Sequence, residues 1–154
     1  MTTVLEYGHV ERVRVHFDDL DPMGIVHNAR YALLLERALA PYWSDRGISF
    51  DGGRPTHPDA FNAVAEFTIG FRAPIRGTGE VAVHFWLDRF GETSAVYGFR
   101  ILSTDHATVY AEGTRAVVRL DPKTMRPTPW TPVAREIAAT LLKTREPVHA
   151  EEAA

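Results

Sequence analysis

Hydrophobic and polar residues alternate along several segments of this chain. Residues 9–17 place Val13, Val15 and Phe17 on one face and charged side chains on the other, which is typical of a half-buried β-strand. The alternation returns in four later segments, which are residues 61–72, 80–89, 93–102 and 107–120. The connections APIRGTG, RFGE and STDH are short enough to join antiparallel neighbours. The pattern predicts one strand and then, after an interruption, four antiparallel strands.

A helical pattern fills the interruption. Apolar residues recur there at helical spacing, as Tyr31, Leu34, Leu35, Ala38, Leu39 and Tyr42. Asn28 is expected to cap the start of this helix and Gly47 to cap its end, while Pro41 should kink the helix or end its regular part. A loop rich in Gly and Pro follows at residues 47–59, and residues 133–143 are expected to form a short helix before a disordered tail.

These elements predict the α+β fold class. A chain of 154 residues fits one domain, whose sheet must bury the apolar stripe of the helix on one face. We expect that domain to span residues 1–130, with residues 131–154 contributing the short helix and the tail.

Composition excludes several functions. A net charge of -3 gives no general attraction to nucleic acid, and the absence of cysteine removes disulfides and thiolate chemistry. No segment has the roughly 20 apolar residues of a membrane span, and the N-terminus lacks a signal pattern. No metal-ligand spacing or Gly-rich phosphate loop is present. We therefore expect a cytoplasmic protein with no membrane span, no nucleic-acid partner, no metal and no cofactor.

The segment DDLDPMGIVHNARY, residues 18–31, carries the candidate chemistry. Asp21 stands shortly before the expected helix start at Asn28, where unpaired backbone N–H groups and the positive end of the helix dipole can hold an oxyanion. A carboxylate facing such donors suits acyl chemistry. The alternative is structural, because Asp before Pro is a common turn residue and the Asn28 side chain could simply cap the helix. Asp19 could also share a face with Asp21 and raise its pKa.

This segment and the order of elements resemble the hotdog-fold thioesterases, in particular the branch with 4-hydroxybenzoyl-CoA thioesterase and the acyl-CoA thioesterases of bacterial envelope operons. FTIGFRAPIRGTGE at residues 67–80 and VVRLDPKTMRP at residues 117–127 support the resemblance, which extends from about residue 10 to residue 127. It implies an antiparallel sheet of about five strands wrapped around one long central helix. It also implies an acyl-CoA or acyl carrier protein substrate and a homodimer or homotetramer, because sites of this family lie between protomers.

The resemblance also implies catalytic roles. Asp21 would be the nucleophile or the general base, and the Asn28 backbone N–H would polarise the thioester carbonyl. His27 departs from the family pattern, because envelope-operon relatives resemble V-Y-H where this chain has Val26, His27 and Asn28. His27 could be a general base, could orient Asp21, or could be a partly exposed polar residue near the helix start.

Substrate contacts are assigned on the same basis. Gly24, Ile25 and Val26 belong to the turn after Asp21, and Tyr31 follows on the helix. Glu36 matches an acidic position that faces the acyl group in the neighbouring protomer's site, although it could instead pair with an Arg on its own helix. Arginines could bind CoA phosphates, and the positions considered are Arg72, Arg76, Arg89 and Arg119. Of these, Arg89 is assigned to the substrate.

The resulting prediction is a thioester hydrolase that releases a carboxylic acid and CoA. Two alternatives remain open. A dehydratase of acyl thioesters would need a His paired with an acid, which His27 and Asp21 match poorly. A domain that binds acyl thioesters without cleaving them would not need Asp21 and the Gly24 turn.

Overall fold

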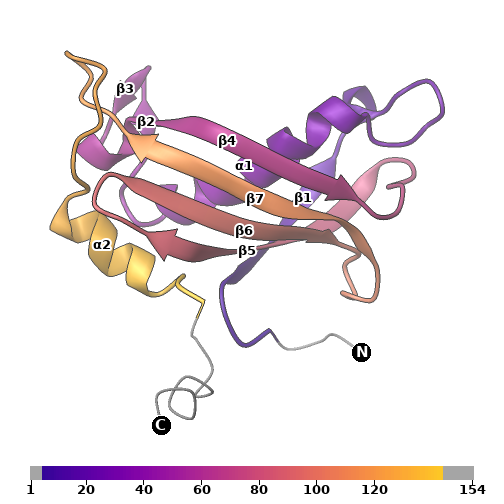
Figure 1. Cartoon of the computed structure of the whole chain (residues 1–154). Coiled ribbons are helices and arrows are strands. Elements are labelled where there is room, and N and C mark those ends of the chain that lie inside the picture. The colour runs from indigo at the N-terminus through magenta and orange to yellow at the C-terminus, as the bar shows by residue number, and fades with distance from the viewer. Residues whose placement is uncertain (1–4, 144–154) are drawn as a thin grey trace, which may run out of the picture.

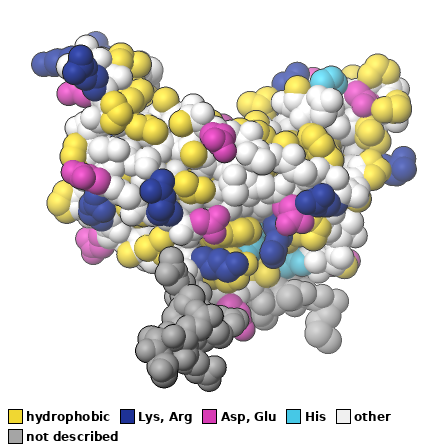
Figure 2. Space-filling view, viewed as in Figure 1, with side chains coloured by type: hydrophobic (Ala, Val, Ile, Leu, Met, Phe, Trp, Pro, Cys, Tyr) yellow, Lys and Arg dark blue, Asp and Glu magenta, His cyan; other side chains and the backbone are white. Residues whose placement is uncertain are grey.

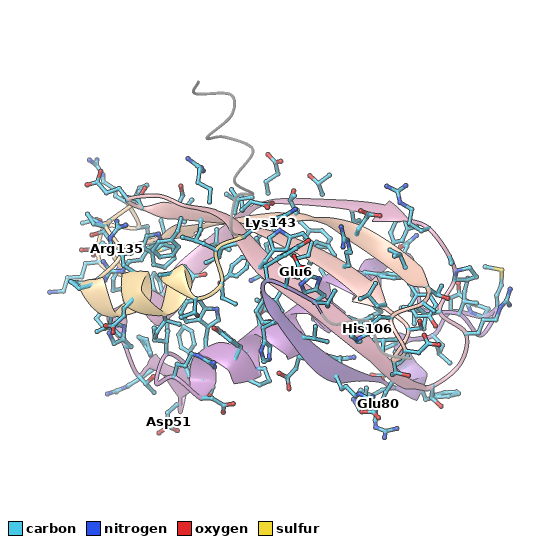
Figure 3. All side chains as sticks on the ribbon, turned by 90° about the horizontal axis from the view of Figure 1, so that it is seen from below. Glu6, Asp51, Glu80, His106, Arg135 and Lys143 are labelled. Atoms are coloured by element: carbon cyan, nitrogen blue, oxygen red, sulfur yellow. The ribbon has the colours of Figure 1, made fainter. Side chains whose placement is uncertain are left out.

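A five-stranded antiparallel sheet forms the body of the molecule in the computed structural model, which describes residues 5–143. The order across the sheet is β1-β5-β6-β7-β4, and α1 lies against one face of it (Figure 1; Figure 3). The strands are β1 (His9–Val15), β4 (Asn62–Phe71), β5 (Gly79–Phe90), β6 (Ser94–Leu102) and β7 (Val109–Arg119). The remaining elements are α1 (Tyr31–Ser44), the hairpin of β2 (Phe50–Asp51) and β3 (Arg54–Pro55), α2 (Pro132–Ala139), and 3-10 turns at Phe17–Asp19, Asn28–Arg30 and Pro58–Ala60.

The apolar stripe of α1 packs into the core, as the sequence predicts. All six residues of the stripe are buried, and they meet the inward-facing side chains of the sheet, among them Val15, Val83, Phe85, Phe99 and Ile101. Burial of that apolar surface is the main favourable contribution to holding the helix on the sheet. The α+β prediction is confirmed, although α1 has only 14 residues.

The position of β4 differs from the prediction. The connection APIRGTG does not join neighbours, because β4 pairs with β7 at one edge of the sheet whereas β5 pairs with β1 near the other. The shorter connections do join the antiparallel neighbours β5–β6 and β6–β7. Residues 72–78 therefore cross between the two edges and pass beside the loop that carries Asp21.

A β-bulge interrupts the alternation within β4. The register against β7 shifts between Val64 and Glu66, so one extra residue is inserted. Phe67 and Ile69 pack against the core as expected, whereas Ala63 and Ala65, which share their parity in the sequence, are exposed. The bulge thus turns the first half of β4 outward.

The two ends of α1 differ in how well the sequence predicts them. His27, not Asn28, caps the helical start, because its Nδ1 accepts the Ala29 N–H at 3.0 Å and Asn28 is already the first residue of the 3-10 turn. At the other end the Gly47 prediction is confirmed, since Gly47 adopts φ 87° and the Ile48 N–H donates to the Trp43 carbonyl at 3.0 Å. Pro41 lies within the helix and does not end it.

Helix α2 covers one end of the sheet. It begins one residue before the predicted segment and ends at Ala139, and the predicted tail lies outside the described residues. After it the chain runs beside β5, where the Leu87 N–H donates to the Leu141 carbonyl and the Lys143 N–H donates to the Leu87 carbonyl. None of the helices at residues 5–143 is long and apolar enough to cross a membrane.

Candidate active site

A tight turn holds Asp21. The Asp21 N–H donates to the Ile25 carbonyl at 2.8 Å, and the Gly24 N–H donates to the Asp21 carbonyl at 2.9 Å. Gly24 has φ 74°, a conformation that favours glycine. The predicted Gly24 turn is therefore a real structural feature.

The two oxygens of the Asp21 carboxylate differ in their partners. Oδ1 accepts the Met23 N–H at 2.8 Å and, more weakly, the Ile25 N–H at 3.4 Å. Oδ2 accepts no hydrogen bond from any residue that the structure describes. Oδ1 thus stabilises the turn, as the structural alternative predicts, whereas Oδ2 is available to a ligand.

A second segment fixes this turn from the side. The Val26 N–H donates to the Ile75 carbonyl at 2.9 Å, and the Gly77 N–H donates to the Gly24 carbonyl at 2.9 Å. Ile25 also forms a β-bridge with Arg76. The connection that follows β4 therefore holds the Asp21 turn in place through backbone hydrogen bonds.

The buried carboxylate of this region is Asp19, not Asp21. Asp19 is fully buried, and both of its oxygens accept from Arg37 of α1, at 2.7 Å to Nη1 and 3.0 Å to Nη2. The hydrogen bonds from the Arg37 guanidinium hold the pKa of Asp19 below its usual value, and the His16 N–H adds to this. Asp19 is thus committed to Arg37, and this bidentate pair fastens α1 to the loop before the site.

The start of the helical segment carries a free donor. The Asn28 N–H has no acceptor within residues 5–143, and Asn28 is exposed. His27 lies beside it but is exposed, with its Nδ1 engaged by Ala29. The hydrogen bonds at residues 5–143 include none between His27 and Asp21, so His27 acts here as a cap.

Asp21 and Asn28 line one open hollow. Ile25, Val26 and Tyr31 also line it, so the structure brings together five of the predicted site residues. Arg72, which the sequence offers only as one of several arginines, also lines the hollow. The remaining wall residues are Met23, Phe71, Ala73 and Pro74, which the sequence pattern does not single out. With Arg72, the last three form the segment FRAP at the end of a predicted strand. Its part in the site could be recognised only with the knowledge that β4 ends beside the Asp21 turn.

The hollow combines apolar walls with one cation. Tyr31 is buried, burial raises the pKa of its hydroxyl, and its ring meets the Phe71 ring edge-on at 5.0 Å between centroids. Arg72 is exposed and reaches Glu112 only at 3.5 Å, so its guanidinium remains accessible to another anion. The loop with Asp21 projects at the upper right of the molecule (Figure 1). Met23 in this loop is 75% exposed, and Phe17 just before it is 84% exposed.

Two predicted substrate residues lie elsewhere. Glu36 follows Asn28 by eight residues, about 12 Å along the helix. It pairs with Arg115 of β7 at 2.7 Å, and not with an Arg of its own helix as the structural alternative had it. Arg89 stands near the end of β5, whereas the Gly79 end of that strand pairs with Val15 near the Asp21 loop. At the rise of a strand, Arg89 is about 30 Å from that end.

Arg119 is engaged structurally. Its Nη1 donates to the Pro129 carbonyl at 2.6 Å, and its Nε lies 3.3 Å from the buried Asp59. Arg119 is therefore a poor choice for a phosphate ligand. Among residues 5–143, no group of three His, Asp or Glu side chains is placed to hold a metal ion.

The antiparallel sheet around α1 defines a hotdog fold. The family model of the thioesterase-like superfamily matches residues 15–138, and the chain belongs to this superfamily. Among curated relatives, "Putative acyl-CoA thioesterase YneP" of Bacillus subtilis (strain 168) is 24% identical over 95 residues, which are 60% of this chain and 67% of that one.

Solved structures share the architecture. The PA5185 protein of Pseudomonas aeruginosa PAO1 superposes with a TM-score of 0.79 at 20% identity, covering 92% of this chain and 96% of that one. A thioesterase of Thermus thermophilus, solved with coenzyme A and Zn, gives a TM-score of 0.69 at 28% identity, covering 89% and 96%. These structures share the hotdog fold, and the family model confirms the predicted family.

Proposed function

We propose that this protein hydrolyses acyl-CoA or acyl carrier protein thioesters to a free carboxylic acid and a thiol. The observation that carries the proposal is the free Oδ2 of Asp21 in the same hollow as the unpaired Asn28 N–H. Membership of the thioesterase-like superfamily and the name of the Bacillus relative support it.

The chemistry follows from these two groups. The thioester carbonyl oxygen accepts the Asn28 N–H, whose position at the start of a helical segment favours the developing negative charge. Asp21 then either attacks the carbonyl carbon, giving an anhydride that water opens, or removes a proton from the water that attacks. In both routes a C–O bond forms, the C–S bond breaks and the thiolate leaves. A thiolate is a good leaving group, so little help from a general acid is needed.

Binding of the substrate is assigned to the walls of the hollow. Ile25, Val26 and Tyr31 supply apolar contacts near the reacting carbonyl, and Gly24 keeps the turn narrow. Arg72 supplies a charge for a CoA phosphate.

A second copy of the chain belongs to this proposal. Glu36 and Arg89 lie away from Asp21 in one protomer, so they reach the same substrate only if a partner protomer brings them there. The family resemblance implies such a site shared between protomers. The outer edge of β4 pairs with no other strand of residues 5–143 and is available to a partner protomer. We therefore retain a homodimer or homotetramer and, within it, a role for Glu36 in acyl-group recognition.

The dehydratase alternative has little support here. It needs a His paired with an acid, and the Nδ1 of His27 is occupied by the Ala29 N–H. The non-catalytic binding alternative remains and is decided by the experiment below.

The test is thiol release from a panel of acyl-CoAs by wild type and Asp21→Asn. An Asn side chain still offers an oxygen to the Met23 N–H, so the turn is kept while the carboxylate is lost. We expect kcat to fall about 100-fold or more, with an unchanged melting temperature. Asp18→Asn is the matched control, since Asp18 is exposed and undergoes the same chemical change.

Two outcomes contradict the proposal. Undiminished turnover by Asp21→Asn would remove Asp21 as the catalytic group, and no turnover of any thioester by wild type would favour the binding alternative. His27→Asn keeps a capping side chain and removes the imidazole. A loss as large as that of Asp21→Asn would make His27 part of the chemistry.

A further inference from the structure

A second cavity lies on the other side of the molecule, between the C-terminal half of α1 and the end of the sheet. It has a volume of about 240 Å³. Its apolar walls combine aromatic and aliphatic side chains, and the aromatic ones come from α1, from the β2–β3 hairpin, from the sheet and from the segment before α2. They include Trp43, Phe50, Phe90, Tyr97 and Trp130. Figure 3 shows α2, marked by Arg135, and the hairpin, marked by Asp51, at this end.

Two hydrogen-bond donors in the wall lack acceptors. Arg115 is only 9% exposed, and its Nε has no hydrogen-bond partner although it is buried. Tyr97 lies directly opposite Arg115 in the β6–β7 register, so both side chains rise from the same face. The Tyr97 hydroxyl accepts from the Trp43 Nε1–H at 2.9 Å, but its own proton goes to no acceptor in the described chain.

Both donors remain protonated at ordinary pH. Burial raises the pKa of Tyr97 far above its usual value, and an arginine does not lose its proton in proteins. A buried donor left without an acceptor is destabilising, because its hydrogen bonds to water are lost and not replaced. An oxygen atom of a bound molecule would remove that destabilisation.

The charged side chains that line the cavity are already paired with side chains of opposite charge. Arg115 is paired with Glu36 at 2.7 Å, and the buried Asp59 is paired with Arg119. Asp59 also accepts from the Thr131 N–H and hydroxyl, so it is not free to bind anything else. The arrangement therefore favours a neutral oxygen acceptor over a second full charge.

The size and the walls restrict the rest of the ligand. A dry apolar cavity of about 150 Å³ holds one benzene, so this cavity has room for one substituted ring. The stacked rings of Phe90 and Trp130, 5.1 Å apart, and the edge of Trp43 present surfaces that aromatic rings pack against well.

We infer that this cavity binds a single aromatic ring that carries a neutral oxygen acceptor, with the oxygen on the Arg115 and Tyr97 donors. The ring can belong to the acyl part of a thioester held mainly by another protomer, or to a free small molecule. In both cases the cavity binds an aromatic ring with a neutral oxygen acceptor, and only the first case rests on the proposed function.

The binding test uses the indole ¹⁵N–¹H signals of the tryptophans during titration with acetophenone. Trp43 and Trp130 line the cavity, whereas Trp86 does not and donates to Asp88, so it is an internal control. We expect the Trp43 and Trp130 signals to shift and the Trp86 signal to stay. Toluene, which lacks the oxygen, and cyclohexyl methyl ketone, which lacks the ring, should each bind at least tenfold more weakly.

Ala40→Leu tests the location. Ala40 lines the cavity but is exposed on α1, so a larger side chain can fill the space without disturbing the core. Ala139→Leu is the matched control on the exposed side of α2. Acetophenone binding should weaken at least tenfold in Ala40→Leu and stay unchanged in Ala139→Leu.

A kinetic measurement distinguishes the two sources of the ring. If the ring is the acyl group, Ala40→Leu lowers kcat/KM for phenylacetyl-CoA at least tenfold relative to acetyl-CoA. If it is a free molecule, that ratio is unchanged while acetophenone binding is still lost. Either result supports the cavity as a ring-binding site.

Two results of the indole titration would overturn the inference. No shift of the Trp43 and Trp130 signals in wild type would mean that the cavity does not bind the ring. Equal shifts in wild type and Ala40→Leu would mean that acetophenone binds outside the cavity. Absence of thioesterase activity would leave the indole measurement intact, so the two proposals fail separately.

Discussion

Asp19 and Asp21 are separated by one residue and have different surroundings. Asp19 is buried against Arg37, whereas Asp21 is half-buried and keeps one oxygen free. The Asp21 turn could be read from the sequence because the Asp-Pro and Gly signals are local. The Asp19–Arg37 pair could not, because 18 residues separate the partners and only the packing of α1 brings them together.

The Asp19–Arg37 pair predicts a dependence of stability on pH. The pKa of Asp19 is lower in the folded state, so the unfolded chain binds more protons as the pH falls below about 4, the pKa of an unfolded aspartate. The stabilisation is fully present above that value and is lost as the pH falls through the folded-state pKa. Asp19→Asn should lower the free energy of unfolding at pH 7 by about 3 kcal/mol.

Denaturant titrations of wild type and Asp19→Asn at pH 7 and pH 3 check this. The difference between the two proteins should shrink at pH 3. An equal difference at both values would mean that the carboxylate charge contributes nothing and that the variant only disturbs packing.

At the scale of the elements, periodicity predicts α1 and most strands because it depends on residues close in sequence. The six buried positions of α1 and the capping glycine at residue 47 are examples. The place of β4 was not predictable in the same way, since its pairing with β7 joins residues far apart in the chain. The bulge at Val64 and Glu66 also breaks the period-two pattern without a residue that marks it.

Helix α2 depends on Thr131. This side chain accepts the Ala134 N–H at the helix start, and its hydroxyl donates to the buried Asp59. Thr131→Ala should destabilise the protein by about 2 kcal/mol, because a cap is lost and a buried carboxylate loses a partner.

Thr131→Ser is the control, since serine keeps the hydroxyl for both contacts and should stay within about 0.5 kcal/mol of wild type. Thermal unfolding of the three proteins measures the effect. Equal losses for Ala and Ser would assign the effect to the methyl group instead of the hydroxyl.

At the scale of the whole molecule, the two edges of the sheet differ. The β1 edge carries Glu11, Arg12 and Arg14, and charges on an edge strand discourage pairing with another chain. The outward half of β4 is almost neutral, and its Val64 is 50% exposed. In Figure 2, hydrophobic side chains are interspersed with few charges along the course of β4, between the two projections at the upper left and upper right.

We expect the β4 edge to join protomers. Wild type should sediment as a dimer or larger, and Val64→Arg should shift it toward the protomer because a charge would enter the interface. Val133→Arg on α2 is the control, since Val133 is 46% exposed and belongs to a helix, not to the edge strand. A monomeric wild type, or a Val64→Arg protein of unchanged mass, would contradict this interface.

The pairing of the Asp21 turn with residues 75–77 restricts where the chain tolerates added length. Connections between strands normally accept insertions, and residues 72–78 would be an obvious place to make one. Here the Ile75 carbonyl and the Gly77 N–H hold the turn in place. An insertion between residues 74 and 78 would therefore alter the site from a distant position in the chain, whereas the tip of the hairpin at residues 52–53 makes no such contact with it.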